Sequence, residues 1–308
     1  MNRFIRLRLL AMLLCLPFLL IFISGCGSSS QKKDEPPVYS PLQVLVPEAT
    51  RKETLGSSPM ILDVSNISQG YFIAQSDSSD LTCSLQIISP SGVLYSYFIA
   101  PGESATVTFT EGSGDYTITG YQQVQGDQYA ALYSETVTVQ LENDFLPFLY
   151  PNQYVNFTPD SKASQLALSM INEDTVDVDA LQQIYDYVVS NLTYDYEKAD
   201  TVTTGYLPDV DETLKTGTGI CFDYAALTTA MLRSCDIPCK LQIGYAGDIK
   251  HAWIDVYIRS KGWVNQAVSF KGDTWTLMDP TFDSNSDDKE AIQDYIGDES
   301  NYTVQFTR

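Results

Sequence analysis

The sequence is organised around a short stretch, GICFDYA at residues 219–225, in which a cysteine follows glycine-rich chain. Gly217 and Gly219 precede Cys221, and residues 222–234 are rich in Ala, Leu and Met, a composition typical of a helix. Pro238 predicts the end of that helix. We therefore expect Cys221 at a helix N-terminus, where unpaired N–H groups and the helix dipole stabilise a thiolate and can receive an oxyanion.

The only histidine of the chain, His251, opens a second stretch, HAWIDVY at residues 251–257. Alternate residues of a strand share a face, so Ala252, Ile254 and their successors form an apolar face. His251 and Trp253 lie on the opposite, polar and aromatic face. This pattern predicts a strand whose second face lines a site, with Trp253 as a candidate for the substrate cleft.

A third stretch, WTLMDPTF at residues 275–282, ends a predicted strand at Asp279. A thiol nucleophile needs a base to take its proton, and an imidazole base needs a partner that fixes its orientation. Each residue by itself also has a purely structural interpretation, because buried cysteines, lone histidines and Asp-Pro turns are common. Cys221, His251 and Asp279 together nevertheless contain all the groups of a catalytic triad.

The three stretches together resemble the transglutaminase-like superfamily, which shares the papain-type Cys-His-Asp order, and the resemblance runs from about residue 160 to 283. It implies an α+β fold of the transglutaminase-like (papain-like cysteine protease) kind. It also implies that Cys221 is the nucleophile, His251 the general base and acid, and Asp279 the group that orients the imidazole. The family usually adds an upstream side-chain donor to the oxyanion hole, for which Tyr194 is the candidate. Asp236 stands where relatives often have Gly.

The N-terminus has the features of a lipoprotein signal peptide over residues 1–25. Three arginines are followed by an apolar run at residues 9–23 and by ISGC at residues 23–26. The alternative, a transmembrane anchor, requires about 20 apolar residues, but GSSSQKK at residues 27–33 ends the run. We expect lipidation of Cys26 and anchoring to the extracytoplasmic face of a bacterial cell membrane.

Composition and periodicity divide the mature chain into three parts. Residues 26–56 are polar and Pro-containing and predict a tether. Residues 57–143 contain short alternating segments separated by turns, which predict an all-β, immunoglobulin-like sandwich domain. Residues 144–308 form the predicted catalytic domain, with helices expected at 161–171 and 178–190 and strands at 240–245, 251–258, 263–270 and 274–278.

Charge and cysteine content narrow the possible partners. The chain carries 39 acidic and 18 basic residues, a net charge of −21, and loss of the three signal arginines makes it more acidic. Such a surface repels nucleic acid and anionic lipid headgroups, so we expect a protein or peptide substrate and membrane attachment through lipid. Cys235 and Cys239 lack the ligands of a zinc site, and their pairing stays open. No metal and no cofactor is predicted.

The predicted function is acyl transfer from a carboxamide or peptide carbonyl through a thioester on Cys221. One alternative is a cysteine peptidase or amidase that hydrolyses surface protein or cell-wall peptide with the same residues. Another is a non-catalytic binding protein on the same scaffold. The sequence leaves transfer and hydrolysis undistinguished, because the triad is common to both.

Overall fold

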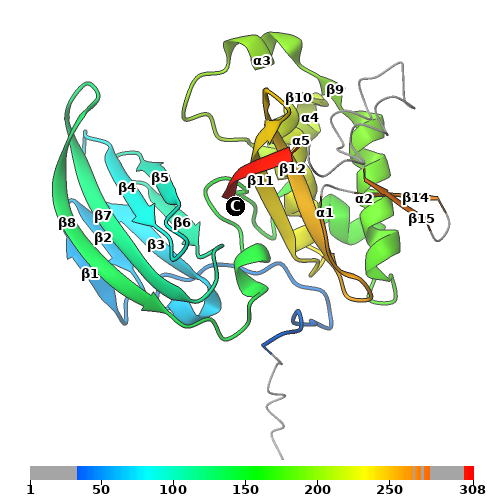
Figure 1. Cartoon of the computed structure of the whole chain (residues 1–308), viewed down its shortest axis with the longest axis horizontal. Helices are drawn as coiled ribbons and strands as arrows, with labels where there is room; N and C mark the ends of the chain where they lie inside the picture. The colour runs from blue at the N-terminus through cyan, green and yellow to red at the C-terminus, as the bar shows by residue number, and fades with distance from the viewer. Residues whose placement is uncertain (1–32, 266–267, 272–273, 278–301) are drawn as a thin grey trace, which may run out of the picture. The chain divides into compact units, whose positions relative to one another are not determined.

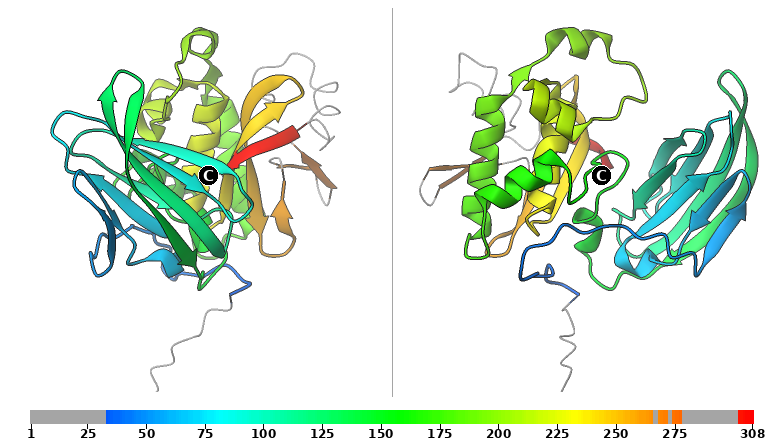
Figure 2. Two further views of the ribbon diagram at one scale, coloured as in Figure 1. Left: turned by 60° about the vertical axis from the view of Figure 1, so that its left-hand side comes forward. Right: turned by 180° about the vertical axis from the view of Figure 1, so that it is seen from behind.

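Two antiparallel sheets make up the N-terminal half of the computed structural model, which describes residues 33–265, 268–271, 274–277 and 302–308. The first sheet has the order β1-β2-β3-β6 and the second β5-β4-β7-β8. Their strands are β1 (Thr54–Ser57), β2 (Met60–Asp63), β3 (Tyr71–Ser76), β4 (Cys83–Ile88), β5 (Leu94–Ile99), β6 (Ser104–Thr108), β7 (Gly114–Gln125) and β8 (Gln128–Val139). Figure 2 shows the two sheets face to face.

The sheets share one hydrophobic core because their strands alternate buried and exposed positions. Met60, Phe72 and Val107 of the first sheet and Leu85 and Ile118 of the second belong to the same buried cluster. The strand content agrees with the expected all-β region, with β1 and β2 as additional strands. The immunoglobulin-like topology stays a prediction.

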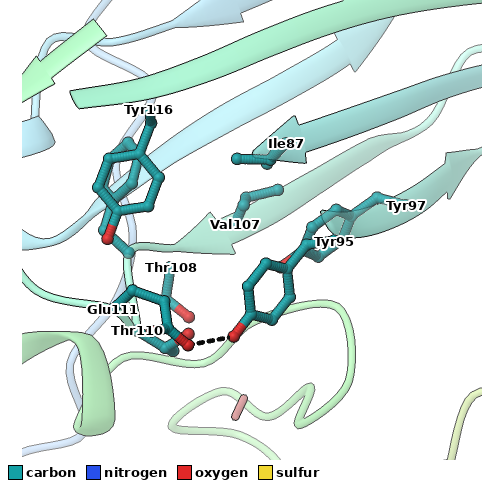
Figure 3. Close-up of a pocket in the computed structure, with 9 residues that line it drawn as sticks. Ile87, Tyr95, Tyr97, Val107, Thr108, Thr110, Glu111 and Tyr116 are labelled. Atoms are coloured by element: carbon teal, nitrogen blue, oxygen red, sulfur yellow. Dashed lines mark hydrogen bonds between the residues drawn. The ribbon is translucent and has the colours of Figure 1, made fainter. Parts of the chain in front are cut away.

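A small cavity lies at one end of this core (Figure 3). It is lined by Tyr95, Tyr97 and Tyr116, among others, and the Tyr95 hydroxyl donates to Glu111 at 2.5 Å. Its volume of about 10 Å³ is at the lower limit for a single water molecule. The cavity therefore has room for at most about one water molecule.

The segment expected to be a tether packs against the rest of the molecule where the structure describes it, from residue 33 to residue 56. Leu45 is buried with Tyr71 and Leu146, while Leu42 and Val44 pack on the core of the C-terminal half. Asn143 also donates a side-chain hydrogen bond to the Glu35 carbonyl at 2.7 Å. This segment packs and is not a free tether because its few apolar residues bury surface against the rest of the molecule. The mostly polar composition of the segment does not reveal those residues.

Helices and a second sheet make up the C-terminal half. The helices are α1 (Lys162–Met170), α2 (Asp177–Asn191), α3 (Tyr196–Thr201), α4 (Val210–Thr216) and α5 (Cys221–Arg233), with single-turn 3-10 helices η1 (Ile67–Gln69) and η2 (Leu146–Phe148) earlier in the chain. The strands are β9 (Thr193–Tyr194), β10 (Thr218–Gly219), β11 (Cys239–Ala246), β12 (Ile249–Ile258), β13 (Gly262–Val264), β14 (Val268–Lys271), β15 (Thr274–Leu277) and β16 (Tyr302–Thr307).

The helix α5 is the centre of this half. It packs on β11 and β12, and α1, α2 and α4 surround it (Figure 1). Its buried residues, including Tyr224 and Leu227, share a core with Ala252 and Ile254 of β12. The apolar face predicted for β12 is thus confirmed, and it faces the helix that Cys221 begins.

The main differences from the expected elements lie after β12. The predicted strand at 263–270 is divided into β13 and β14, and β16, which was not predicted, joins the edge of the sheet β13-β12-β11-β16. The signal peptide, Cys26 and Asp279 lie outside the described residues. None of the helices in the described part of the chain is long and apolar enough to cross a bilayer.

Candidate active site

Cys221 is the first residue of α5, with Ile220 as the N-cap, as the glycine-rich approach predicts. Its side chain is half-buried, whereas Cys83, Cys235 and Cys239 are buried; all four are free thiols. Within the described residues the backbone N–H groups of Cys221 and Phe222 have no acceptor. These two donors are suitably placed to receive the oxygen of a carbonyl that Cys221 attacks.

His251 lies on β12, opposite Gly244 of β11, and is 6% exposed. Its ring stacks on Trp253 with centroids 6.2 Å apart and also lies 6.5 Å from the ring of Tyr302. The helix α5 that begins at Cys221 packs on β12 through the apolar face of Ala252 and Ile254, whereas alternation places His251 on the opposite face of the strand.

Trp253 does not line an open cleft. It is 1% exposed and packs with Ala246 and Tyr302 in a small separate cluster. Its ring meets that of Tyr302 edge-on at 5.0 Å. Direct contact with a substrate would require this cluster to open, so the structure favours a supporting role beside His251 over the expected cleft role.

Tyr194 lies beside the approach to Cys221. The strand β9 that contains it pairs in parallel with β10, and Tyr194 stands opposite Gly219. The next N–H, that of Asp195, donates to the Gly219 carbonyl at 2.9 Å. This pairing fixes the backbone of Tyr194 near the start of α5, which is what an upstream oxyanion donor requires.

Sequence reasoning missed a buried charged cluster immediately behind Cys221. The Asp223 side chain is fully buried and accepts from Lys198 Nζ at 2.7 Å and from the Tyr206 hydroxyl at 2.5 Å. The Ile220 N–H donates to the same carboxylate at 2.8 Å. One sequence signal was available, since an acidic residue at the third position of a helix commonly caps it.

Asp279, the expected partner of the imidazole, and Cys26, the expected lipidation site, lie outside the described residues, so their roles stay predictions. No group of metal-ligating side chains occurs in the part of the chain that the structure describes. A thiol at a helix start, donors beside it and an imidazole on the adjacent strand can carry out nucleophilic acyl chemistry.

A family comparison matches residues 164–280 to the model of the transglutaminase-like superfamily. The matched segment includes Cys221, His251 and Asp279. A search among curated proteins found no significant match.

Solved structures with a similar arrangement are distant in sequence. A candidate cysteine protease from Cytophaga hutchinsonii is 17% identical with a TM-score of 0.37, covering 83% of this chain and 84% of that one. The periplasmic domain of TgpA from Pseudomonas aeruginosa is 14% identical with a TM-score of 0.32, covering 69% and 91%. Red sea bream transglutaminase is 15% identical with a TM-score of 0.26, covering 70% and 48%. At these identities and TM-scores the likenesses say nothing about substrate or activity.

Proposed function

We propose that the chain is a lipid-anchored, extracytoplasmic, transglutaminase-like cysteine enzyme that transfers an acyl group from a carboxamide or peptide carbonyl. One observation carries the proposal: Cys221 begins α5, with the N–H groups of Cys221 and Phe222 beside its thiol. The helix dipole and two N–H donors stabilise a thiolate at this position.

The proposed reaction has two halves. His251 takes the proton of the Cys221 thiol, the sulfur bonds to the carbonyl carbon, and the N–H groups of Cys221 and Phe222 hold the oxyanion. Asp279 accepts from the imidazole, and Tyr194 adds a side-chain donor. The C–N bond then breaks, the amine leaves with the proton from His251, and a thioester remains. A second amine gives transfer, whereas water gives hydrolysis.

Incubation of the protein with a glutamine peptide and a labelled primary amine distinguishes these outcomes. Incorporated label supports transfer. Ammonia or peptide cleavage without label shows the amidase or peptidase alternative. If neither occurs and substrate peptide still binds, the protein is the non-catalytic binding protein.

The triad assignment predicts a large loss of turnover on replacement of single residues. Cys221→Ala and His251→Ala should each lower the rate by several orders of magnitude, because groups that act as a unit lose most of their effect together. Cys235→Ala is the matched control, since burial raises the pKa of that thiol to about 12 and keeps it protonated. Equal labelling of Cys221 by a thiol-directed electrophile before and after His251→Ala would contradict the role of the base.

The anchoring part of the proposal has an independent test. Protein isolated from bacterial membranes should begin at Cys26 and carry lipid mass, and Cys26→Ser should release it from the membrane fraction. A mature chain that begins well beyond Cys26 and carries no lipid would refute this part alone.

A further inference from the structure

The carboxylate of Asp223 is fully buried, yet three donors surround it. Lys198 Nζ, the Tyr206 hydroxyl and the Ile220 N–H all lie within 2.5–2.8 Å of its two oxygens. The Lys198 ammonium also donates to the Tyr206 hydroxyl at 2.6 Å and lies 4.4 Å from the centre of that ring. A buried carboxylate is tolerated when it is paired and hydrogen-bonded in this way.

Two of the three donors, Lys198 and Tyr206, come from the segment between β9 and α4. Lys198 belongs to α3, whose N-cap Asp195 accepts the Lys198 N–H at 2.8 Å, and Tyr206 follows in the loop before α4. The same segment is joined to the approach of Cys221 by the β9–β10 pair. Gly219 makes the close fit possible, because a Cβ there would lie 2.6 Å from Asp223 Cβ.

We propose that Lys198, Asp223 and Tyr206 form a positioning cluster that fixes the first turn of α5 and, through the balance of its charges, sets the reactivity of the Cys221 thiol. This inference rests on the proposed function in that it takes Cys221 as the nucleophile. None of the three residues is assigned a contact with substrate.

The charges of the cluster act on Cys221 with opposite signs. An acidic residue in the first turn stabilises the helix, but Asp223 lies two positions from Cys221, where its charge opposes a second negative charge on the sulfur. Lys198 compensates for that charge. Burial lowers the pKa of Lys198, but its bonds to Asp223 and Tyr206 outweigh burial and raise it, so the ammonium stays charged.

Tyr206 contributes a hydrogen bond and no charge. Burial, followed by the bond to Asp223, raises the pKa of Tyr206 to about 12, so its hydroxyl remains a donor at neutral pH. Other titratable groups on the elements packed around the start of α5 include Tyr194 of β9, Asp195 and Glu197 at the start of α3, Asp211, Glu212 and Lys215 of α4, and Lys250, His251 and Asp255 of β12. Of these groups, only Lys215 is replaced in the test that follows, in the control variant.

The test measures alkylation of Cys221 by iodoacetamide against pH in the full-length protein, quantified by mass on the Cys221 peptide. Lys198→Met should lower the alkylation rate of Cys221 at neutral pH about three- to tenfold. Lys198→Arg should restore most of the rate. Asp223→Asn, which keeps an oxygen for the Ile220 N–H, should raise the rate. The double variant should lie near wild type.

Lys215→Met is the matched control, because Lys215 is exposed and pairs only with Glu212 among the described residues. Alkylation rates at neutral pH that change in the same direction for Lys198→Met and Asp223→Asn, or by no more than in the control, would overturn the cluster proposal. If Lys198→Met does not fold by circular dichroism, the faster alkylation of Asp223→Asn decides alone. Failure of the proposed function is separate: wild type would then release no ammonia and transfer no label, whatever the alkylation rates.

Discussion

Asp236 occupies a position that is unfavourable for an aspartate in both its backbone conformation and its burial. It follows α5 with a left-handed backbone, φ 58°, and is 1% exposed. Its carboxylate oxygens have no close hydrogen-bond partner among the described residues. Burial raises the pKa of Asp236 to about 7, although the Tyr39 N–H and the Arg259 guanidinium favour the charged form. Glycine, which the resemblance indicates at this position in relatives, would avoid both penalties.

Asp236→Asn should therefore stabilise the protein in a pH-dependent way. The folded pKa lies above the unfolded value, so the wild type loses stability as the pH rises from about 4 to about 7. The variant lacks this loss and should exceed wild type by about 2 kcal/mol near pH 8, with the difference almost absent near pH 4. Urea denaturation at both pH values measures it, and a difference that does not change with pH would refute the assignment.

At the level of single residues, part of the site could be predicted from the sequence. Cys221 and His251 could be recognised from the sequence. Cys221 stands at the start of a segment with helix-forming composition, and His251 stands at the start of an alternating strand pattern. The bond between Lys198 and Asp223 could not be recognised, because it joins residues 25 positions apart through a loop path without periodicity. Alternation placed Trp253 on a face of the strand, but it did not show that Tyr302 and Ala246 pack against that face.

Helix α1 illustrates stabilisation between elements. Its first N–H groups, those of Lys162 and Ala163, both donate to the carboxylate of Asp211 on α4 at 3.0 Å. The cap thus comes from another helix and not from Ser161, the local N-cap, whose side chain makes no capping bond. The helix α2 was predictable from its apolar periodicity and α5 from its Ala, Leu and Met composition, whereas α3 and α4 are too short to show either signal.

Asp211→Ala should destabilise the protein by about 1 kcal/mol through loss of this cap. Glu212→Ala is the matched control, because Glu212 is the adjacent acid and its side chain pairs only with exposed Lys215 among the described residues. That change should stay within about 0.5 kcal/mol. Chemical denaturation of both variants measures the effect, and equal losses would show that the cap has no special role.

At the scale of the whole molecule, Arg233 joins segments that are far apart in the chain. It is fully buried, and its guanidinium donates to the carbonyls of Tyr150, Cys239 and Arg308 at 2.8–3.0 Å. Burial lowers the pKa of Arg233 to about 10, so it remains charged at neutral pH. One side chain thus links the region before α1, the start of β11 and the end of β16.

Arg233→Met should destabilise the whole described unit by about 3–5 kcal/mol, because it removes these bonds without replacing them. Arg233→Lys should recover only part of the loss, since an ammonium cannot reach three carbonyls in the planar fork of a guanidinium. Thermal unfolding followed by near-ultraviolet circular dichroism measures both. A melting temperature unchanged in Arg233→Met would contradict the linking role.

The distribution of thiols has a consequence for handling the protein in air. Of the four described cysteines, three are buried, and burial raises the pKa of Cys235 and of Cys239 to about 12. Oxidation follows thiolate character and exposure, so Cys221 should form sulfenic acid first. The N–H groups at the start of α5 would stabilise the negatively charged sulfinate that forms next. Early loss of thiol at this one position should be recovered with dithiothreitol, and later loss should be permanent.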